Sequence, residues 1–270
     1  MCGIVGLLAK NERTRAELGP LLEPMLIGMT GRGPDSAGFA VFGAPAGDLA
    51  RLNLTSPPGF DWTALAAELA AAFPAIVSVE GRARHGLVVA HGDIDAIAAH
   101  LAARHPALSV MARGTTMDIY KDVGLPEEVA TRYGLSAMRG THGIGHTRMA
   151  TESGISLQHA HPFVAGEDFC LVHNGSLSNP YGIRRRLERR GLVFESDNDT
   201  EAAARYVQWR LAEGDDLRSA LEKVLADVDG FYTLLMAGRE GLAIVRDTFA
   251  CKPAVVAETD DWVAIASEYR

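Results

Sequence analysis

The chain has 270 residues, of which 47% are apolar, with a net charge of −8 and an isoelectric point near 5.6. This length and composition suffice to bury one large core, or a core and a small satellite, and predict a globular protein. The acidic balance argues against nucleic acid or an anionic membrane surface as a partner, because both require a basic patch. No stretch is long and apolar enough to predict a membrane span.

The three cysteines are far apart in the sequence, at Cys2, Cys170 and Cys251. An odd number at this spacing predicts neither a disulfide framework nor a paired metal-binding motif. The apolar run at the N-terminus is too short for a signal peptide, and no basic segment precedes it. These features together lead us to expect a reducing compartment, the cytoplasm.

The first 42 residues predict two buried strands joined by a helix. The strands are expected at Gly3–Ala9 and Ser36–Phe42, and leucine and methionine recur at helical spacing over residues 18–29. Pro20 and Pro24 should kink or shorten that helix. The glycine- and proline-rich run over residues 43–59 then interrupts the pattern, which indicates a boundary.

Residues 61–117 predict a compact unit of helices and short strands. A helix is expected from Trp62, followed by strands over 75–79 and 86–91, a second helix over 94–101 and a strand over 108–112. We interpret this unit as a small α/β insert, at about residues 51–117, within one domain that spans residues 1–270.

The second half of the chain is rich in glycine, histidine and asparagine around short apolar runs, a composition typical of loops that carry chemistry. Helices are predicted over residues 200–211 and 217–228, the second ending at Gly230. Four apolar runs separated by turns then predict an antiparallel meander, at residues 231–237, 241–246, 254–257 and 262–266.

Cys2 has an unusual chemical option. If Met1 is removed, which is common before a small second residue, the Cys2 thiol lies beside its own free α-amine. An α-amine has a pKa of about 7.7–8.0 and can accept the thiol proton near neutral pH. The position alone says little, because a cysteine at the start of a strand is usually a small buried hydrophobe.

Six segments together resemble the class II glutamine amidotransferases, which include the glutaminase domains of amidophosphoribosyltransferase, glucosamine-6-phosphate synthase and glutamate synthase. They occur in the family's order and with its rough spacing. The resemblance covers residues 1–42 and 120–270, and the insert falls outside it. The segments are Met1-Cys2-Gly3-Ile4-Val5-Gly6, Arg32-Gly33-Pro34-Asp35-Ser36, Gly145-His146-Thr147-Arg148-Met149-Ala150-Thr151, His161-Pro162-Phe163, His173-Asn174-Gly175 and Asp199-Thr200-Glu201.

The resemblance implies a role for each of five residues. Cys2 would be the nucleophile, and the Asn174 side chain with the Gly175 backbone N–H would stabilise the tetrahedral oxyanion. Arg148 would bind the α-carboxylate of the substrate through a bidentate guanidinium, and Asp199 would bind its α-ammonium group.

Four further positions have a supporting role in the family or depart from its pattern. The resemblance makes Arg32 and Asp35 a structural pair near the nucleophile and brings His161 close to the substrate. A histidine before proline is equally typical of a turn, so both interpretations of His161 stay open. Met149 stands where the family often has an aromatic residue, which affects the loop that closes over glutamine.

The implied fold is α+β, a four-layer αββα N-terminal-nucleophile hydrolase sandwich of two antiparallel sheets with helices outside. The chain looks most like the stand-alone amidotransferase subunits of glutamate-synthase-like complexes, N-methylglutamate synthase in particular. The substrate would be glutamine or a related glutamyl amide. The acceptor would lie on synthase subunits of a hetero-oligomeric complex, and FMN and an iron–sulfur cluster would be carried there, with no cofactor in this chain.

Two other functions stay open at the level of the sequence. Five histidines lie close together in the sequence and could indicate a metallohydrolase, although matching carboxylate ligands are missing, and we predict no metal. A chain that kept the fold but lost turnover would be a regulatory or assembly subunit. Retention of the five residues above argues against that second alternative. The histidines are His142, His146, His159, His161 and His173.

Overall fold

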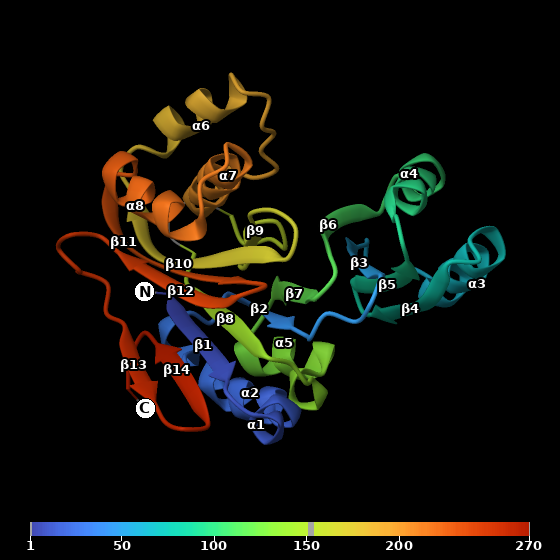
Figure 1. The fold of residues 1–270 in the computed structure, drawn as a ribbon, viewed down its shortest axis with the longest axis horizontal. Helices are drawn as coiled ribbons and strands as arrows, with labels where there is room; N and C mark the ends of the chain where they lie inside the picture. The colour runs from blue at the N-terminus through green and yellow to red at the C-terminus, as the bar shows by residue number, and fades with distance from the viewer. Residues whose placement is uncertain (1, 151–153, 270) are drawn as a thin grey trace.

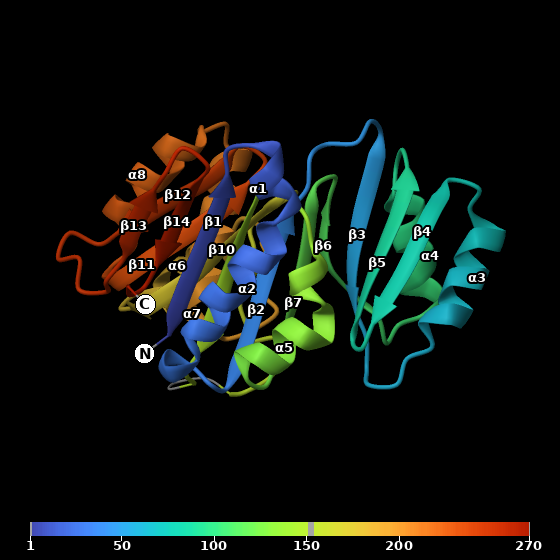
Figure 2. The same ribbon diagram turned by 90° about the horizontal axis from the view of Figure 1, so that it is seen from below.

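The computed structural model describes residues 2–150 and 154–269, so Met1 and Thr151 of the quoted segments lie outside the described residues. Two antiparallel sheets lie face to face, and helices cover the outer face of each, as Figures 1 and 2 show. A smaller unit with its own sheet projects from one side of this sandwich (Figure 1).

The first sheet has six strands in the order β13-β14-β1-β8-β2-β7. The five-residue helix α1 (Glu12–Ala16) and the helices α2 (Leu18–Gly28) and α5 (Pro126–Tyr133) pack on its outer side. The strands are β1 (Gly3–Ala9), β2 (Ser36–Phe42), β7 (Met117–Val123), β8 (His142–Arg148), β13 (Val255–Glu258) and β14 (Trp262–Ala266).

The helix between β1 and β2 breaks at Glu17, which separates α1 from α2, and not at a proline. Pro20 lies in the first turn of α2, where its missing N–H is not needed, and Pro24 lies inside the helix. Burial of Leu22 and its neighbours against the first sheet outweighs the one hydrogen bond that Pro24 removes. The prolines therefore do not shorten this helix, and the alternative effect, a kink, stays a prediction.

The second sheet has four strands in the order β12-β11-β10-β9. Its outer face packs on three helices, α6 (Pro180–Glu188), α7 (Asp199–Ala212) and α8 (Leu217–Asp227). The strands are β9 (Phe163–Val164), β10 (Phe169–Leu177), β11 (Gly230–Gly238) and β12 (Gly241–Arg246).

Three apolar clusters stack through the sandwich and define its four layers. One lies between the two sheets and includes Ile144 from β8 and Val172 from β10. The others lie between each sheet and its helices, around Phe39 on the first side and Leu234 on the second. Each sheet is therefore buried on both faces where it passes through the centre of the molecule.

The last four strands do not form one meander, and that prediction was wrong. β11 and β12 pair in the second sheet, whereas β13 and β14 pair in the first, beside β1. The chain crosses between the sheets over residues 247–254. Alternating apolar residues identify strands but carry no information about which sheet receives them.

The projecting unit is a four-stranded antiparallel sheet in the order β4-β5-β3-β6, with two helices and an apolar cluster of its own. Its first strand lies inside the run 43–59 that had suggested only a break. The elements are β3 (Leu49–Thr55), α3 (Trp62–Ala72), β4 (Ile76–Arg82), β5 (His85–His91), α4 (Asp95–Arg104) and β6 (Ser109–Gly114).

Asp168 fastens the end of this unit to the sandwich. Its carboxylate, which is buried, accepts hydrogen bonds from the backbone N–H groups of Thr115, Thr116 and Met117 and from the Arg239 guanidinium. No helix in the described ranges has the length and apolar composition needed to cross a membrane.

Candidate active site

A small cavity of about 140 Å³ opens where the two sheets and one helix meet. Cys2 precedes β1, Arg148 ends β8, Gly175 lies near the end of β10 and Asp199 begins α7, and all four line this cavity. The antiparallel pairing of β1 with β8 brings Gly3 opposite Thr147, which sets Cys2 beside Arg148. Four of the five principal residues predicted from the sequence therefore line one cavity.

The Cys2 thiol is partly buried, and its Sγ lies 3.9 Å from the carbonyl oxygen of Met149. Arg32 Nε donates a hydrogen bond of 2.9 Å to the Cys2 carbonyl, and Arg32 forms an ion pair of 3.0 Å with Glu268. Burial raises the pKa of the Cys2 thiol more than the Met149 contact and the Arg148 charge lower it. The thiol therefore needs a nearby base to become a nucleophile.

Asn174 and Gly175 lie on β10, and the adjacent strand β11 fixes their backbone. Asn174 is 2% exposed, and its Nδ2 has no hydrogen-bond partner among the described residues. Gly175 has φ +144°, and a Cβ there would lie 2.0 Å from the carbonyl oxygen of Phe231. Only glycine fits this position, and Asn174, which is not among the residues that line the cavity, keeps an unused amide donor next to it.

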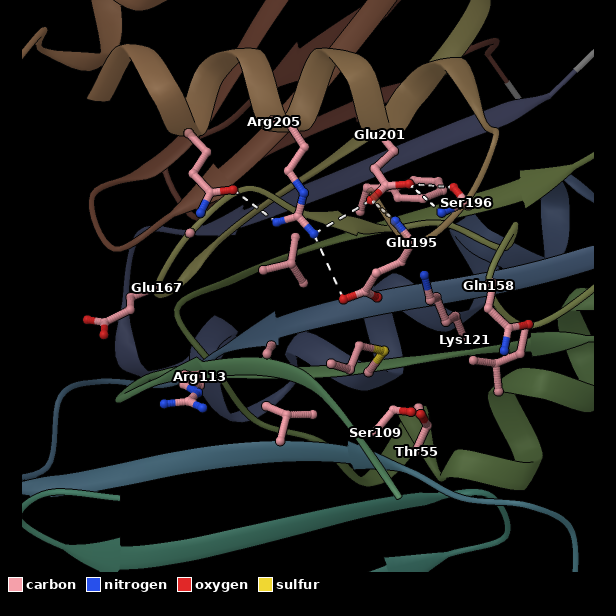
Figure 3. Close-up of a pocket in the computed structure, with 18 residues that line it drawn as sticks. Thr55, Ser109, Arg113, Lys121, Gln158, Glu167, Glu195, Ser196, Glu201 and Arg205 are labelled. Atoms are coloured by element: carbon pink, nitrogen blue, oxygen red, sulfur yellow. Dashed lines mark hydrogen bonds and ion pairs between the residues drawn. The ribbon is translucent and has the colours of Figure 1, made fainter. Parts of the chain in front are cut away.

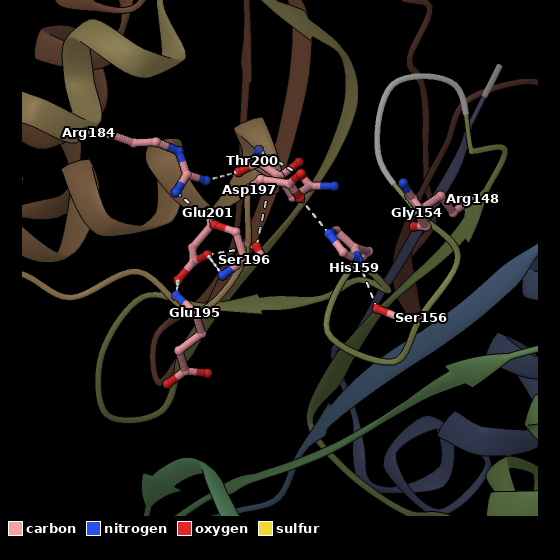
Figure 4. A network of polar contacts seen from close by, with 11 residues as sticks. Arg148, Gly154, Ser156, His159, Arg184, Glu195, Ser196, Asp197, Thr200 and Glu201 are labelled. Carbon is pink, nitrogen blue, oxygen red and sulfur yellow. Dashed lines mark hydrogen bonds and ion pairs between the residues drawn. The ribbon is translucent and has the colours of Figure 1, made fainter.

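Arg148 and Asp199 provide opposite charges in the same cavity. Arg148 is 4% exposed, and one guanidinium nitrogen donates to the carbonyl oxygen of Gly154 at 2.9 Å (Figure 4). Asp199 accepts a hydrogen bond of 2.9 Å from the Leu177 N–H. Burial would raise the Asp199 pKa, but the nearby His173 and the backbone donors outweigh it and lower the pKa. Asp199 is thus an anion, suited to hold an ammonium group.

Asp35 and Arg32 hold different segments of the site. The Asp35 carboxylate accepts a hydrogen bond of 2.8 Å from the Ala150 N–H, and its backbone N–H donates to the Arg148 carbonyl. Arg32 holds the Cys2 backbone instead, as described above. The two residues thus support the cavity from the sides of Arg148 and Cys2 respectively, and not through a contact that joins their side chains.

His161 is almost fully buried and borders the cavity through a polar cluster. Its Nε2 lies 2.8 Å from Thr200 Oγ1, which in turn lies 2.9 Å from His173 Nδ1. The His161 ring also stacks on His146, with ring centroids 4.0 Å apart. His161 thus lines this cavity together with Thr200, a residue that stands in one of the six segments and was given no role there.

Two loops meet at the edge of the cavity. His159 Nε2 lies 2.5 Å from the carboxylate of Asp197, and its Nδ1 lies 2.7 Å from Ser156 Oγ, as Figure 4 shows. Asp197 lines the cavity, as do the exposed side chains of Met149 and Tyr181. Sequence reasoning missed Tyr181 and Asp197, which lie outside the six segments, and it considered His159 only as a candidate metal ligand.

The five clustered histidines do not converge on one point. His142 stacks on Phe42, His159 lies in the edge loop, and the other three belong to the cluster around Thr200. Within residues 2–150 and 154–269, no group of three or more histidine, cysteine or carboxylate side chains has the geometry of a metal site.

A family model described as "Glutamine amidotransferase domain" matches residues 146–270. The glutamine amidotransferase-like protein GlxB of Rhizobium meliloti is 49% identical over 273 residues, which cover 100% of this chain and 90% of that protein. A candidate glutamine amidotransferase of Methanothermobacter thermautotrophicus is 34% identical over 290 residues, covering 99% of this chain and 92% of that one.

A solved structure shares the fold at low sequence identity. It is the glutamine phosphoribosylpyrophosphate amidotransferase of B. subtilis with ADP and GMP, with a TM-score of 0.59 and 18% identity. The match covers 98% of this chain but 42% of that one. The predicted α+β sandwich is confirmed, and the chain belongs to the class II glutamine amidotransferase family.

Proposed function

We propose that this chain is a glutaminase subunit that hydrolyses the side-chain amide of glutamine, or of a related glutamyl amide, through a Cys2 thioester. The observation that carries the proposal is the convergence of Cys2, Arg148, Gly175 and Asp199 on one small cavity. A cavity of about 140 Å³ is small for drug-sized ligands and suits a molecule of about ten non-hydrogen atoms, such as a free amino acid.

In the proposed reaction, the substrate α-carboxylate binds Arg148 and its α-ammonium binds Asp199. The Cys2 thiol attacks the amide carbonyl carbon after giving its proton to the Cys2 α-amine, which requires removal of Met1. The oxyanion receives hydrogen bonds from Asn174 and the Gly175 N–H. The α-amine then returns the proton to the leaving nitrogen, which departs as ammonia.

Water completes the cycle. It attacks the thioester carbonyl, the α-amine accepts its proton, and the acid product leaves while Cys2 regains its thiol. The net reaction is amide plus water to carboxylic acid plus ammonia, which become carboxylate and ammonium at neutral pH. The raised pKa of the buried Cys2 thiol agrees with a need for this internal base.

We further propose that the ammonia is used by partner synthase subunits, in an N-methylglutamate synthase or a similar glutamate-synthase-like complex, with FMN and the iron–sulfur cluster on those partners. The resemblance to stand-alone amidotransferase subunits supports this assignment, and it is carried by residues 1–42, the helix end at residues 26–30, the long insert and the strand at residues 119–124. Purification of the native complex and identification of its subunits by mass spectrometry would test it. Recovery of the chain alone, with full ammonia-forming activity, would contradict it.

The glutaminase proposal is tested by labelling with an electrophilic glutamine analogue. The processed chain, which starts at Cys2, should be labelled at Cys2 and should release ammonia from glutamine. A chain that retains Met1 has its base locked in a peptide bond and should react at least about a hundredfold more slowly. Equal labelling of both forms would overturn the role of the α-amine, and no labelling of either would favour a catalytically silent subunit.

A further inference from the structure

A second and larger cavity lies between the projecting unit and the sandwich. It encloses about 370 Å³, within the usual range of small-molecule sites, and none of its residues has a role in the proposed reaction. We call it the junction cavity, and six polar residues define it for the argument that follows. They are Thr55, Ser109, Lys121, Gln158, Glu195 and Arg205 (Figure 3).

Lys121 on β7 places an ammonium group in this cavity, where it has few hydrogen-bond partners. Lys121 is 6% exposed, and its Nζ donates one hydrogen bond of 3.2 Å to the Pro162 carbonyl. It also lies 4.7 Å from the ring centroid of Phe163. None of the ion pairs within the described ranges includes Lys121. Burial lowers the Lys121 pKa to about 8, against the opposing effect of nearby glutamates. A buried cation with so few partners is costly unless an anion joins it.

Arg205 on α7 brings a second cation to the same space. Figure 3 shows its guanidinium reaching down from the helix while Lys121 points up from the strand below. Arg205 donates to Gln208 Oε1 at 2.9 Å, but its two ion pairs are long, 3.6 Å to Glu201 and 4.0 Å to Glu195. Its Nε is buried without a hydrogen-bond partner. Both cations therefore have N–H groups that could donate hydrogen bonds to a carboxylate.

The acidic residues of the cavity differ in how well they are paired. Glu201 is buried and accepts hydrogen bonds from the Glu195 N–H and from the N–H and hydroxyl of Ser196. The Glu195 carboxylate is 73% exposed, with Arg205 at 4.0 Å as its ion-pair partner. A multiply charged phosphate would be repelled by these carboxylates, whereas an ammonium group would be attracted to Glu195.

We propose that the junction cavity binds a free α-amino acid, with its carboxylate on Lys121 and Arg205 and its ammonium group on Glu195, and that this ligand alters the neighbouring Cys2 cavity. A zwitterion is the ligand that satisfies both the underused cations and the exposed carboxylate. The hydroxyl and amide groups of Ser109 and Gln158 are available for its side chain.

The two cavities are lined by neighbouring residues of the same chain segments, which gives the ligand a physical route to the Cys2 site. Glu201 holds Ser196 on the junction side, and the residues that follow Ser196, from Asp197 to Thr200, line the Cys2 cavity. Lys121 holds the Pro162 carbonyl, and the preceding residue, His161, also lines the Cys2 cavity. The binding does not depend on the proposed glutaminase function, whereas an effect on glutamine turnover rests on it.

The experiment begins with the Cys2→Ala variant of the full chain, so that turnover cannot consume a ligand. The twenty common amino acids are screened by thermal shift, and those that stabilise the protein are measured by isothermal titration calorimetry. We expect at least one to bind, and its analogues without the ammonium group or without the α-carboxylate to bind at least about tenfold more weakly. Failure of all twenty to bind, or tighter binding of inorganic phosphate, would overturn the proposal.

Variants then assign the binding to one cavity. Lys121→Met and Glu195→Gln, each made in the Cys2→Ala background, should weaken binding by about tenfold or more, while the same substitution at an exposed lysine, Lys10→Met, should not. Lys121→Met removes a buried charge and Glu195→Gln changes an exposed side chain, so both should fold. If Arg148→Ala abolishes binding and the two junction variants do not, the ligand occupies the Cys2 cavity and the proposal is wrong.

The effect on the Cys2 cavity is measured without glutamine. Alkylation of Cys2 by iodoacetamide is followed by mass spectrometry, which separates it from reaction at the exposed Cys251. The bound amino acid should change the Cys2 rate at least about threefold in the wild-type chain and leave it unchanged in Lys121→Met. An unchanged rate in the wild type, at a ligand concentration that saturates the site, would overturn the coupling.

Discussion

At the scale of single residues, the unused hydrogen-bond donor of Asn174 sets this site apart from an ordinary strand end. Buried amide groups normally find partners, because an unpaired one costs about 1–3 kcal/mol. The Asn174 Nδ2 has none among the described residues, beside a glycine whose backbone admits no side chain. An unpaired donor at this position is what the proposed oxyanion role of Asn174 requires, because it leaves an N–H group for the charge that forms in the reaction.

The proposed reaction divides the five principal residues between substrate binding and chemistry, which predicts different kinetic effects. Asn174→Ala should lower kcat for glutamine hydrolysis by about 10²–10³ with little change in KM, because its amide meets the oxyanion in the transition state. Arg148→Ala and Asp199→Asn should mainly raise KM, because they hold the charged groups of the substrate in both states. Steady-state kinetics of ammonia release would measure both, and one common pattern for the three variants would contradict these roles.

Gly175 offers a matched structural test. Gly175→Ala forces a Cβ to within 2.0 Å of the Phe231 carbonyl at a backbone angle that suits glycine alone. The strand must shift, so we expect loss of glutaminase activity by at least about tenfold together with a lower melting temperature. Gly182→Ala is the control, since a Cβ at Gly182 meets nothing within 4 Å, and it should change neither activity nor stability by much. Wild-type activity in Gly175→Ala would show that this backbone geometry is not needed.

At the scale of elements, Asp168 joins the projecting unit to the sandwich. The residue lies between β9 and β10, with φ +48°, and receives donors from the segment that links β6 and β7. Burial would raise its pKa, but the backbone donors of Thr116 and Thr115 and the Arg239 contact outweigh it and lower the pKa. One carboxylate therefore fixes the connection between two units with separate cores.

Asp168→Ala should lower the free energy of unfolding by about 3 kcal/mol, because several buried N–H groups lose a charged acceptor. Arg239→Ala, which removes the half-exposed partner alone, should cost less than about 1 kcal/mol. Urea denaturation of the two variants measures both values. Equal and small decreases in the free energy of unfolding would mean that the Asp168 carboxylate does not stabilise the connection between the two units.

At the scale of the whole molecule, four histidines lie buried where a positive charge is poorly tolerated. Burial lowers the pKa of His85 and His142 to about 4 and that of His146 to about 3, and places that of His161 well below its ordinary value. The folded state keeps them neutral, while the unfolded chain protonates them at about pH 6.5. Below that pH the unfolded state binds more protons, so stability falls.

Each such histidine should therefore cost about 1.4 kcal/mol of unfolding free energy per pH unit between about pH 6.5 and its folded pKa. His142 allows a test outside the active site, because it stacks on Phe42 far along β8 from Arg148. Denaturation of the wild type and of His142→Gln at about pH 7, 6 and 5 should give a shallower pH dependence in the variant. Parallel curves would show that His142 does not contribute.

The sequence by itself determined much of the fold and the chemistry of the site. Local patterns fixed β1, β2, α7 and α8, because apolar periodicity and helix ends are set by neighbouring residues. The motifs also selected Cys2, Arg148, Gly175 and Asp199, which line one cavity, because the family resemblance gives each of them a role in the proposed reaction.

Only the tertiary structure decided how distant segments pair. It put β13 and β14 in the first sheet and β11 and β12 in the second, added β3 to the projecting unit, and divided Arg32 and Asp35 between Cys2 and Ala150. It also enclosed Lys121 and Arg205 in one cavity, from residues with no shared sequence signal. The physical reason is that strand alternation and single charges describe a residue's local surroundings, whereas sheet membership and cavities depend on contacts between segments far apart in the chain.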